Sequence, residues 1–236
     1  MYERSSRYYD RIYASKDYAG EAEKLASWID RELRTSGRRL LDVACGTGRH
    51  LEHLKARFDA EGLDLSPALL DIARARNPEL TFYCADMRTF ALDARYDVIT
   101  CLFSSIGYMT TRADLNRAIA RMADHVVSGG LLLVEPWFVP EAWKPNTVHA
   151  LFIDDLELKI ARVNTSLTKG RISVFDLHHL IGTPQGTEHL VEHHELGLYT
   201  VDEMTEAFAA AGLDVRYDAE GLTGRGLHIA RKGEDG

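Results

Sequence analysis

Acidic residues stand at three points of the sequence where a short apolar run ends, and the first lies beside a Gly-x-Gly turn. Asp42 comes just before Gly46 and Gly48, Asp64 ends the second run, and Asp86 ends the third. Glycines at such a turn let the backbone approach a ligand closely. A carboxylate at Asp42 suits an ammonium group, one at Asp64 can accept both ribose hydroxyls, and one at Asp86 can accept an adenine amino group. The pattern predicts a site for a ligand that contains adenosine and an amino group.

A dinucleotide site is the alternative interpretation of the same turn. The dinucleotide fingerprint G-x-G-x-x-G needs a third glycine, and this chain has Leu51 at that position. A Rossmann-like domain that binds NAD or another nucleotide therefore stays open, but the three acids favour the first interpretation.

The residues around these acids predict an α/β core. Residues 39 to 135 alternate apolar runs with helical patterns, which is typical of a parallel sheet covered by helices. Another helix is expected over residues 18 to 34, where Ala22, Leu25 and Ile29 share one face, after a tyrosine-rich segment that we expect to cover a cleft.

Residues 146 to 198 read differently, as three long alternating runs separated by glycine-containing turns. Alternation of this kind predicts antiparallel strands. We expect three such strands to be inserted into the α/β core, which resumes with a helix after Thr200 and closes with a hairpin. The expected parts of this single domain are a lid and helix over 1–35, a ligand-binding core over 39–137, the insert over 138–199, and a helix and hairpin over 200–232.

Composition and charge exclude several classes of protein. The chain has 236 residues, and 28 Lys and Arg against 36 Asp and Glu leave a net charge of −8. An acidic chain lacks the basic surface of a general nucleic-acid or anionic-membrane binder. No apolar run reaches about 18 residues, and the N-terminus is charged where a signal peptide would be apolar. Cys45, Cys84 and Cys101 have no C-x-x-C spacing, so we expect reduced thiols and a cytoplasmic protein.

The ten histidines raise the question of a metal site. His193 and His194 must point to opposite faces of a strand, and His189 lies too far along it from His193 to share an ion. We expect no protein-bound metal.

The order of acids and elements resembles the class I S-adenosylmethionine-dependent methyltransferases, which have a Rossmann-like fold with a seven-stranded, mainly parallel sheet. The whole chain further resembles the dTDP-aminosugar N,N-dimethyltransferases of the desosamine and mycaminose pathways. The shared stretches are Met1-Tyr2-Glu3, Tyr9-Asp10-Arg11-Ile12-Tyr13, Lys16-Asp17-Tyr18-Ala19, Leu41 to Gly48, Gly62 to Ser66, Asp86-Met87-Arg88, Phe103 to Gly107, Glu135-Pro136-Trp137, Ala161-Arg162-Val163, Val191-Glu192-His193 and Gly224 to Leu227.

The resemblance implies an activity, a cofactor and partners. It implies an enzyme of antibiotic biosynthesis that methylates the amine of a nucleotide-linked deoxysugar twice, with S-adenosylmethionine as donor and S-adenosylhomocysteine as product. It also implies a homodimer, formed through the inserted sheet, which serves as lid and dimer surface. Phe138 departs from the family's second Trp, and residues 140 to 190 match poorly apart from Ala161-Arg162-Val163. A methyltransferase for another small amine or hydroxyl acceptor, and a non-catalytic nucleotide-binding protein, are the alternatives.

The pattern and the resemblance together give a set of candidate site residues. The expected cofactor-binding residues are Tyr18, Asp42, Ala44, Gly46, Gly48, Asp64, Leu65, Asp86, Met87 and Phe103. The expected substrate-binding residues are Ser104, Ser105, Tyr108, Trp137, Arg162 and Arg225, and the catalytic candidates are His125 and Tyr13.

Each of the less certain candidates has a structural alternative. His125 ends a predicted helix and can cap its carbonyls instead of accepting a proton from the amine. Tyr13 can close over the methyl group or pack on the core, and Arg225 can contact a diphosphate or lie exposed in a turn. Trp137 and Tyr108 can wall the acceptor or pack inside. Because positioning contributes about 7–11 kcal/mol and a general base about 3–6 kcal/mol, we expect geometry to outweigh proton transfer.

Overall fold

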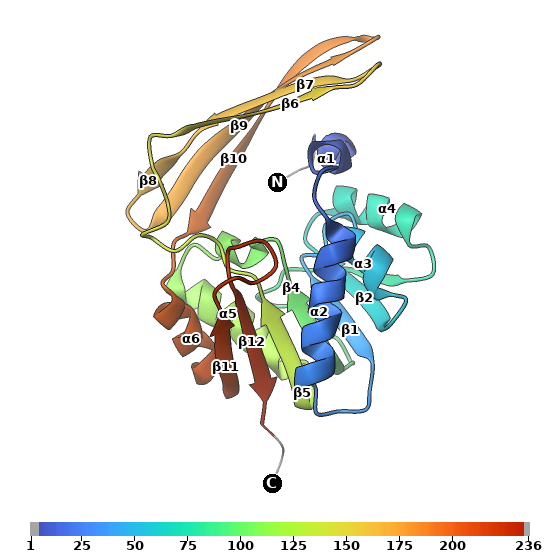
Figure 1. Cartoon of the computed structure of the whole chain (residues 1–236), viewed down its shortest axis with the longest axis vertical. Helices are drawn as coiled ribbons and strands as arrows, with labels where there is room; N and C mark the ends of the chain where they lie inside the picture. Colours follow the sequence, from blue (N-terminus) through green and yellow to red (C-terminus); the bar gives the residue numbers. More distant parts are fainter. Residues whose placement is uncertain (1–4, 234–236) are drawn as a thin grey trace.

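The computed structural model describes residues 5–233, so Met1, Tyr2 and Glu3 of the resemblance lie outside the described part. The structure contains two sheets. Helices surround the first sheet, and Figure 1 shows the second sheet above this sheet and its helices. Within the described residues, no helix is both long and apolar enough to cross a bilayer.

The first sheet has seven strands in the order β11-β12-β5-β4-β1-β2-β3. Neighbours from β3 to β5 run parallel, whereas β12 is antiparallel to both β5 and β11. The predicted seven-stranded, mainly parallel sheet with its closing hairpin is confirmed. Its strands are β1 (Arg39–Val43), β2 (Asp59–Asp64), β3 (Thr81–Cys84), β4 (Tyr96–Cys101), β5 (Val126–Val134), β11 (Leu213–Asp218) and β12 (Leu227–Lys232).

Helices cover both faces of this sheet. Successive residues of each strand point to opposite sides, and apolar side chains on both sides pack against helices. On one face Leu40 and Val98 pack with α2, α3 and α4, and on the other Leu41 and Ile99 pack with α5 and α6. Burial on both sides explains why the strands read as continuous apolar runs. The helices are α2 (Tyr18–Glu32), α3 (Arg49–Leu54), α4 (Pro67–Arg76), α5 (Arg112–Asp124) and α6 (Val201–Ala210), and a short 3₁₀ turn, η1, spans Ser105–Tyr108.

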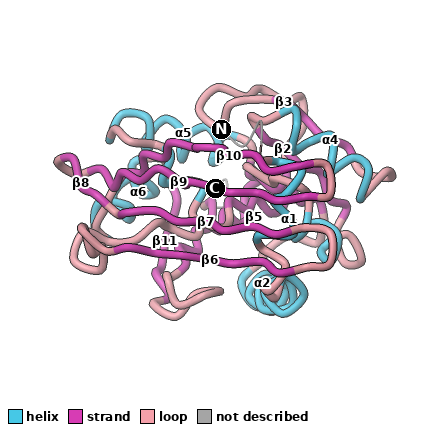
Figure 2. Tube along the Cα trace, turned by 90° about the horizontal axis from the view of Figure 1, so that it is seen from above, coloured by secondary structure: helices cyan, strands magenta, loops and turns pink. Residues whose placement is uncertain are grey.

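The second sheet is antiparallel and has five strands, so the expectation of three was too low. Its main order is β10-β9-β7-β6, with β8 paired to β9, and Figure 2 shows these strands lying across the molecule from above. Strand β6 escaped prediction because apolar residues such as Val148 and Phe152 lie on its exposed face, which hides the usual alternation. The strands are β6 (Val148–Asp154), β7 (Lys159–Thr165), β8 (Leu167–Lys169), β9 (Ile172–Thr183) and β10 (Gly186–Gly197).

Helix α1 (Ser6–Ile12) lies between the two sheets (Figure 1). Tyr8 and Ile12 pack against Ile181 and its neighbours in the second sheet. From the same helix, Asp10 accepts a hydrogen bond of 2.7 Å from the hydroxyl of Thr47, in the Gly-x-Gly turn of the core. The tyrosine-rich segment therefore joins the insert to the ligand-binding turn.

Candidate active site

A cavity of about 570 Å³ opens at the carboxyl ends of β1, β2 and β3. The parallel strands bring these ends to one edge of the sheet, as the strand-end acids predicted. Eight of the predicted site residues line the cavity: Ala44, Gly46, Asp64, Leu65, Asp86 and Met87 from the cofactor set, and Ser105 and Tyr108 from the substrate set.

Asp64 lines this cavity from the end of β2. The side chain is only 8% exposed, and its two oxygens accept the backbone N–H groups of Gly46 and Ser66, each at 2.8 Å. Burial raises the pKa of Asp64 above its ordinary value, while the N–H groups oppose that shift. These bonds fix the carboxylate at the mouth of the turn, in a place suited to ribose hydroxyls.

The surroundings of Asp64 fit an adenosyl group. Leu65 is 65% exposed beside it, and Met87 offers a second apolar surface across the cavity. No neighbouring atom lies within 4 Å of the position that a Cβ of Gly46 would take, so a ligand can approach the backbone there. Asp86 also lines the cavity, and its hydrogen bonds with Arg88 hold its pKa below the usual range.

Two members of the cofactor set lie behind the turn rather than in the cavity lining. Asp42 is almost fully buried and accepts a hydrogen bond of 2.7 Å from Thr100, and burial raises its pKa to about 6. Gly48 has a φ of +71° and begins α3, where a side chain would meet the Asn77 amide at 2.9 Å. Gly48 therefore shapes the turn, and an ammonium contact for Asp42 stays a prediction.

A second group of predicted residues gathers around Phe103. The ring of Tyr13 meets that of Phe103 edge-on at 5.2 Å, and the Arg225 guanidinium lies 5.2 Å from the Phe103 centroid. Arg162, from the inserted sheet, donates a hydrogen bond of 3.2 Å to the Tyr13 hydroxyl. The fold thus brings together an aromatic and cationic cluster from segments that are far apart in the sequence.

Lys16 completes this cluster and was not predicted as a site residue. Its ammonium lies 4.9 Å from the Phe103 ring and 4.8 Å from the ring of Tyr18, and it also pairs with Glu21. Tyr18 is buried against His50, edge to face, so it packs within the core beside the site. The charged Lys16 after the tyrosine-rich segment was the available signal.

The insert also contacts residues that line the cavity. Tyr108, which lines the cavity, shares a hydrogen bond of 3.0 Å with Nδ1 of His194 in β10. Burial lowers the pKa of His194 to about 4, so its imidazole is neutral near pH 7. Trp137 donates to the Ser173 hydroxyl at 2.9 Å and stacks on Phe175, and both of these partners belong to β9 of the insert.

Ser104 is not among the residues that line the cavity, which argues against its assignment to substrate binding. Its side chain is almost fully buried, and its hydroxyl donates to the carbonyl of Pro136 at 2.7 Å. The left-handed backbone at Phe103 and Ser104, with φ of +52° and +63°, turns this side chain inward and leaves Ser105 facing the cavity.

The structure also contradicts a catalytic role for His125. Its carbonyl accepts the N–H of Tyr96 at the beginning of β4, at the amino edge of the sheet and therefore opposite the cavity. Nε2 accepts the N–H of Leu92 at 3.1 Å, so Nδ1 carries the proton that it donates to the carbonyl of Arg121 at 2.8 Å. The alternative, a histidine that caps the helix end, describes this geometry.

Several cavity residues were missed by the sequence analysis. Tyr9 lines it from α1, Arg88 and Thr110 line it from the core, and His193 and Glu195 line it from β10. Asp176 and Glu195 flank His193, and their hydrogen bonds raise its pKa above the ordinary value. Tyr9 belongs to the tyrosine-rich segment, but the local pattern of β10 carries no signal for which core loop it meets.

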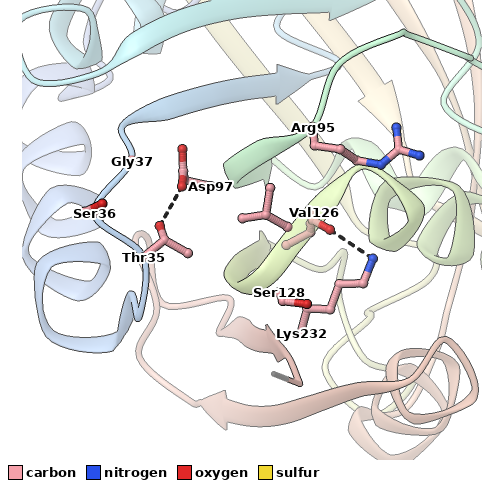
Figure 3. A pocket seen from close by; sticks show the side chains of 9 residues that line it. Thr35, Ser36, Gly37, Arg95, Asp97, Val126, Ser128 and Lys232 are labelled. Atoms are coloured by element: carbon pink, nitrogen blue, oxygen red, sulfur yellow. Dashed lines mark hydrogen bonds between the residues drawn. The ribbon is translucent and has the colours of Figure 1, made fainter. Parts of the chain in front are cut away.

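A second hollow, of about 560 Å³, lies at the amino edge of the sheet (Figure 3). Its polar groups bond to one another: Thr35 donates to Asp97 at 2.6 Å, and Lys232 donates to the carbonyl of Val126 at 2.9 Å. These contacts cap strands and a helix end. The hollow lies at the opposite edge of the sheet from the cavity that contains Asp64. Across residues 5–233, no group of three or more His, Cys, Asp or Glu side chains is arranged to hold a metal ion.

The strand order, the acid at the end of β2 and the open glycine turn define a Rossmann-like class I methyltransferase, dependent on S-adenosylmethionine. Residues 40–130 match a family described as a methyltransferase domain.

Comparison over the full length is more specific. The chain is 40% identical to the dTDP-3-amino-3,6-dideoxy-alpha-D-glucopyranose N,N-dimethyltransferase of Streptomyces fradiae, over 97% of this chain and 91% of that protein. The structure of Streptomyces venezuelae DesVI matches with a TM-score of 0.91 and 36% identity, covering 97% of this chain and 98% of that one. The S-adenosylmethionine-bound structure of CalS10, an amino pentose methyltransferase from Micromonospora echinaspora, matches with a TM-score of 0.86 and 36% identity over 98% of each chain. This chain belongs to the family of dTDP-aminosugar N,N-dimethyltransferases.

Proposed function

We propose that the protein is an N-methyltransferase that adds two methyl groups to the amine of a dTDP-linked amino-deoxysugar. The observation that carries this proposal is the cationic and aromatic cluster around Phe103, next to a cavity suited to an adenosyl group. Family membership supports it, since the Streptomyces fradiae relative is named for this activity.

The donor side of the site would hold S-adenosylmethionine through named groups. Asp64 would accept the ribose hydroxyls, Leu65 and Met87 would enclose the adenine, and the turn at Gly46 would admit the methionyl end. When bound, S-adenosylmethionine supplies an electrophilic methyl group on its sulfonium. The residues of the turn then have to orient the donor and exclude water around it.

The acceptor side would bind the diphosphate and aim the amine. A guanidinium suits phosphate oxygens because its N–H groups can bind two of them at once, and Arg162 and Arg225 present two guanidinium groups near Phe103. Tyr13 contacts both Arg162 and Phe103 and would close over the reacting atoms. His125 lies at the opposite edge of the sheet and does not act as a base here. Orientation of an uncharged amine is therefore the main source of rate in our proposal.

Mass spectrometry of the reaction products tests the function. The protein is incubated with S-adenosylmethionine and with dTDP-3-amino and dTDP-4-amino sugars, beside the free aminosugars and the dTDP-sugars that carry hydroxyl in place of the amine. We expect one and then two methyl groups on nucleotide-linked amines only. Methylation of the free amines or hydroxyl controls would instead select another small-molecule methyltransferase, and binding without turnover would indicate a non-catalytic protein.

The proposal includes a homodimer formed through the outer face of the inserted sheet. Apolar side chains lie exposed together on this face, and Phe152 is 72% exposed. A contiguous apolar surface of this kind marks a protein contact. Cross-strand pairs place Phe152 beside Ala161, and Ala161 beside Leu180, in one continuous patch. We also propose a cytoplasmic location, where the free Cys45, Cys84 and Cys101 would stay reduced.

Replacing Phe152 with lysine should dissociate this dimer. A two-fold interface contains the residue twice, and an aromatic anchor contributes about 2 kcal/mol or more per copy, so the dimer dissociation constant should rise about 1,000-fold or more. Light scattering coupled to size-exclusion chromatography measures the change. Leu156→Lys is the matched control, because Leu156 is also an exposed apolar residue but lies between β6 and β7 rather than on the strand face. Equal effects of the two substitutions would contradict the assignment.

A further inference from the structure

Glu135, directly after β5, has a side chain with no exposed surface and no part in the mechanism above. One carboxylate oxygen accepts the backbone N–H of Phe103 at 2.6 Å, and the other accepts the Thr223 hydroxyl at 2.6 Å. The same second oxygen lies 3.7 Å from Nε of Arg225. One buried carboxylate therefore connects the loop after β4 with the loop before β12.

The loop after β4 needs to be held in place. Phe103 and Ser104 both have left-handed backbone, which is unfavourable for residues other than glycine and persists only when the surroundings enforce it. Glu135 bonds the first of these residues, and the carbonyl of the adjacent Pro136 bonds the second. On the other side of the turn, a Cβ on Gly107 would lie 2.9 Å from the Cβ of Trp137, so η1 packs closely against the same segment.

The loop before β12 is held by the same carboxylate. Arg225 donates from Nε to the Thr223 hydroxyl at 3.2 Å, and that hydroxyl donates to Glu135. The Arg225 side chain is mostly buried, and its guanidinium lies over Phe103. A buried carboxylate is costly unless charged and polar partners surround it, and here those partners are the Phe103 N–H, the Thr223 hydroxyl and the Arg225 guanidinium.

We propose that Glu135 is a positioning residue that sets Phe103 and Arg225 relative to each other and thereby shapes the acceptor subsite. The inference rests on the proposed function for its meaning, because Arg225 binds the diphosphate in that proposal and its guanidinium lies over the Phe103 ring. Without the carboxylate, the turn at Phe103 and the guanidinium of Arg225 move independently of each other.

Glu135→Gln tests the role with nearly unchanged shape. The amide keeps one acceptor oxygen but loses the charge that attracts Arg225 and one of the two acceptors. We expect the KM for the nucleotide sugar to rise about 10-fold and the dissociation constant of S-adenosylhomocysteine to change less than about twofold. The matched control is Glu61→Gln, since Glu61 accepts the hydroxyls of Tyr96 at 2.6 Å and Tyr83 at 3.1 Å within the same sheet. That control should leave the KM unchanged.

Hydrogen exchange provides a measurement that needs no acceptor. In Glu135→Gln the amides of residues 103–105 and of residues 221–227 should both exchange faster, whereas Thr223→Val should accelerate only the second segment. If the exchange changes in this way but wild-type enzyme methylates no aminosugar, the proposed function fails and the coupling stands. Unchanged exchange in Glu135→Gln, or an equal rise of KM in Glu135→Gln and Glu61→Gln, would overturn the positioning role.

Discussion

Replacing Asp64 with alanine should weaken the binding of S-adenosylmethionine by about 10- to 150-fold. The carboxylate is held at the cavity mouth by the N–H groups of Gly46 and Ser66, so it meets the ribose hydroxyls without reorganisation. A hydrogen bond to a charged group contributes about 1.5–3 kcal/mol, which gives the expected range. Isothermal titration calorimetry with S-adenosylmethionine and S-adenosylhomocysteine measures the loss.

Two further variants show whether the loss comes from the ribose contact. Asp64→Asn keeps the size and one acceptor for the turn, and it should bind with intermediate affinity. Asp59→Ala removes an exposed acid from the beginning of the same strand, β2, and should bind the donor normally. Normal affinity in Asp64→Ala, with the turn still folded, would remove Asp64 from the donor site.

The core and the cofactor-binding side of the candidate site could be predicted because local sequence determines them. Strand runs buried on both faces, a glycine turn and acids at strand ends place Asp64 and Asp86 at one edge of a parallel sheet. The same logic reaches Glu135, an acid at the end of β5 that belongs to one of the stretches shared with the family. Its position at a strand end could have been used to predict a role, but the sequence does not show that its partners are Phe103 and Thr223.

The insert could be recognised but not positioned. Alternation identifies β7, β9 and β10 as strands, yet it does not say how their sheet is oriented over the core. The contacts of His193, Glu195 and Arg162 with the site depend on that orientation. The predicted number of strands was too low for a related reason. The exposed face of β6 carries apolar residues, so its sequence does not alternate between apolar and polar residues as the other strands do.

His125 was misplaced although the topology contained the answer. In a βαβ unit the helix runs opposite to the strands, so a residue at the end of α5, just before β5, must lie at the amino edge of the sheet. The ligand cavity lies at the carboxyl edge. The resemblance suggested a role for this histidine that the direction of the helix excludes.

Replacing His125 with alanine should therefore reduce stability rather than catalysis. The side chain is 3% exposed, and its loss leaves the N–H of Leu92 and the carbonyl of Arg121 without their bonds inside the protein. Unpaired buried groups and the vacated volume together cost about 2–4 kcal/mol, which lowers the melting temperature by about 5–15 °C. We expect kcat at 15–20 °C, where the variant stays folded, to remain within about twofold of wild type. His53→Ala, an exposed histidine on α3, should change neither quantity. A folded His125→Ala protein with a kcat reduced more than about 100-fold would restore the catalytic hypothesis, because no structural role at the amino edge would produce that loss.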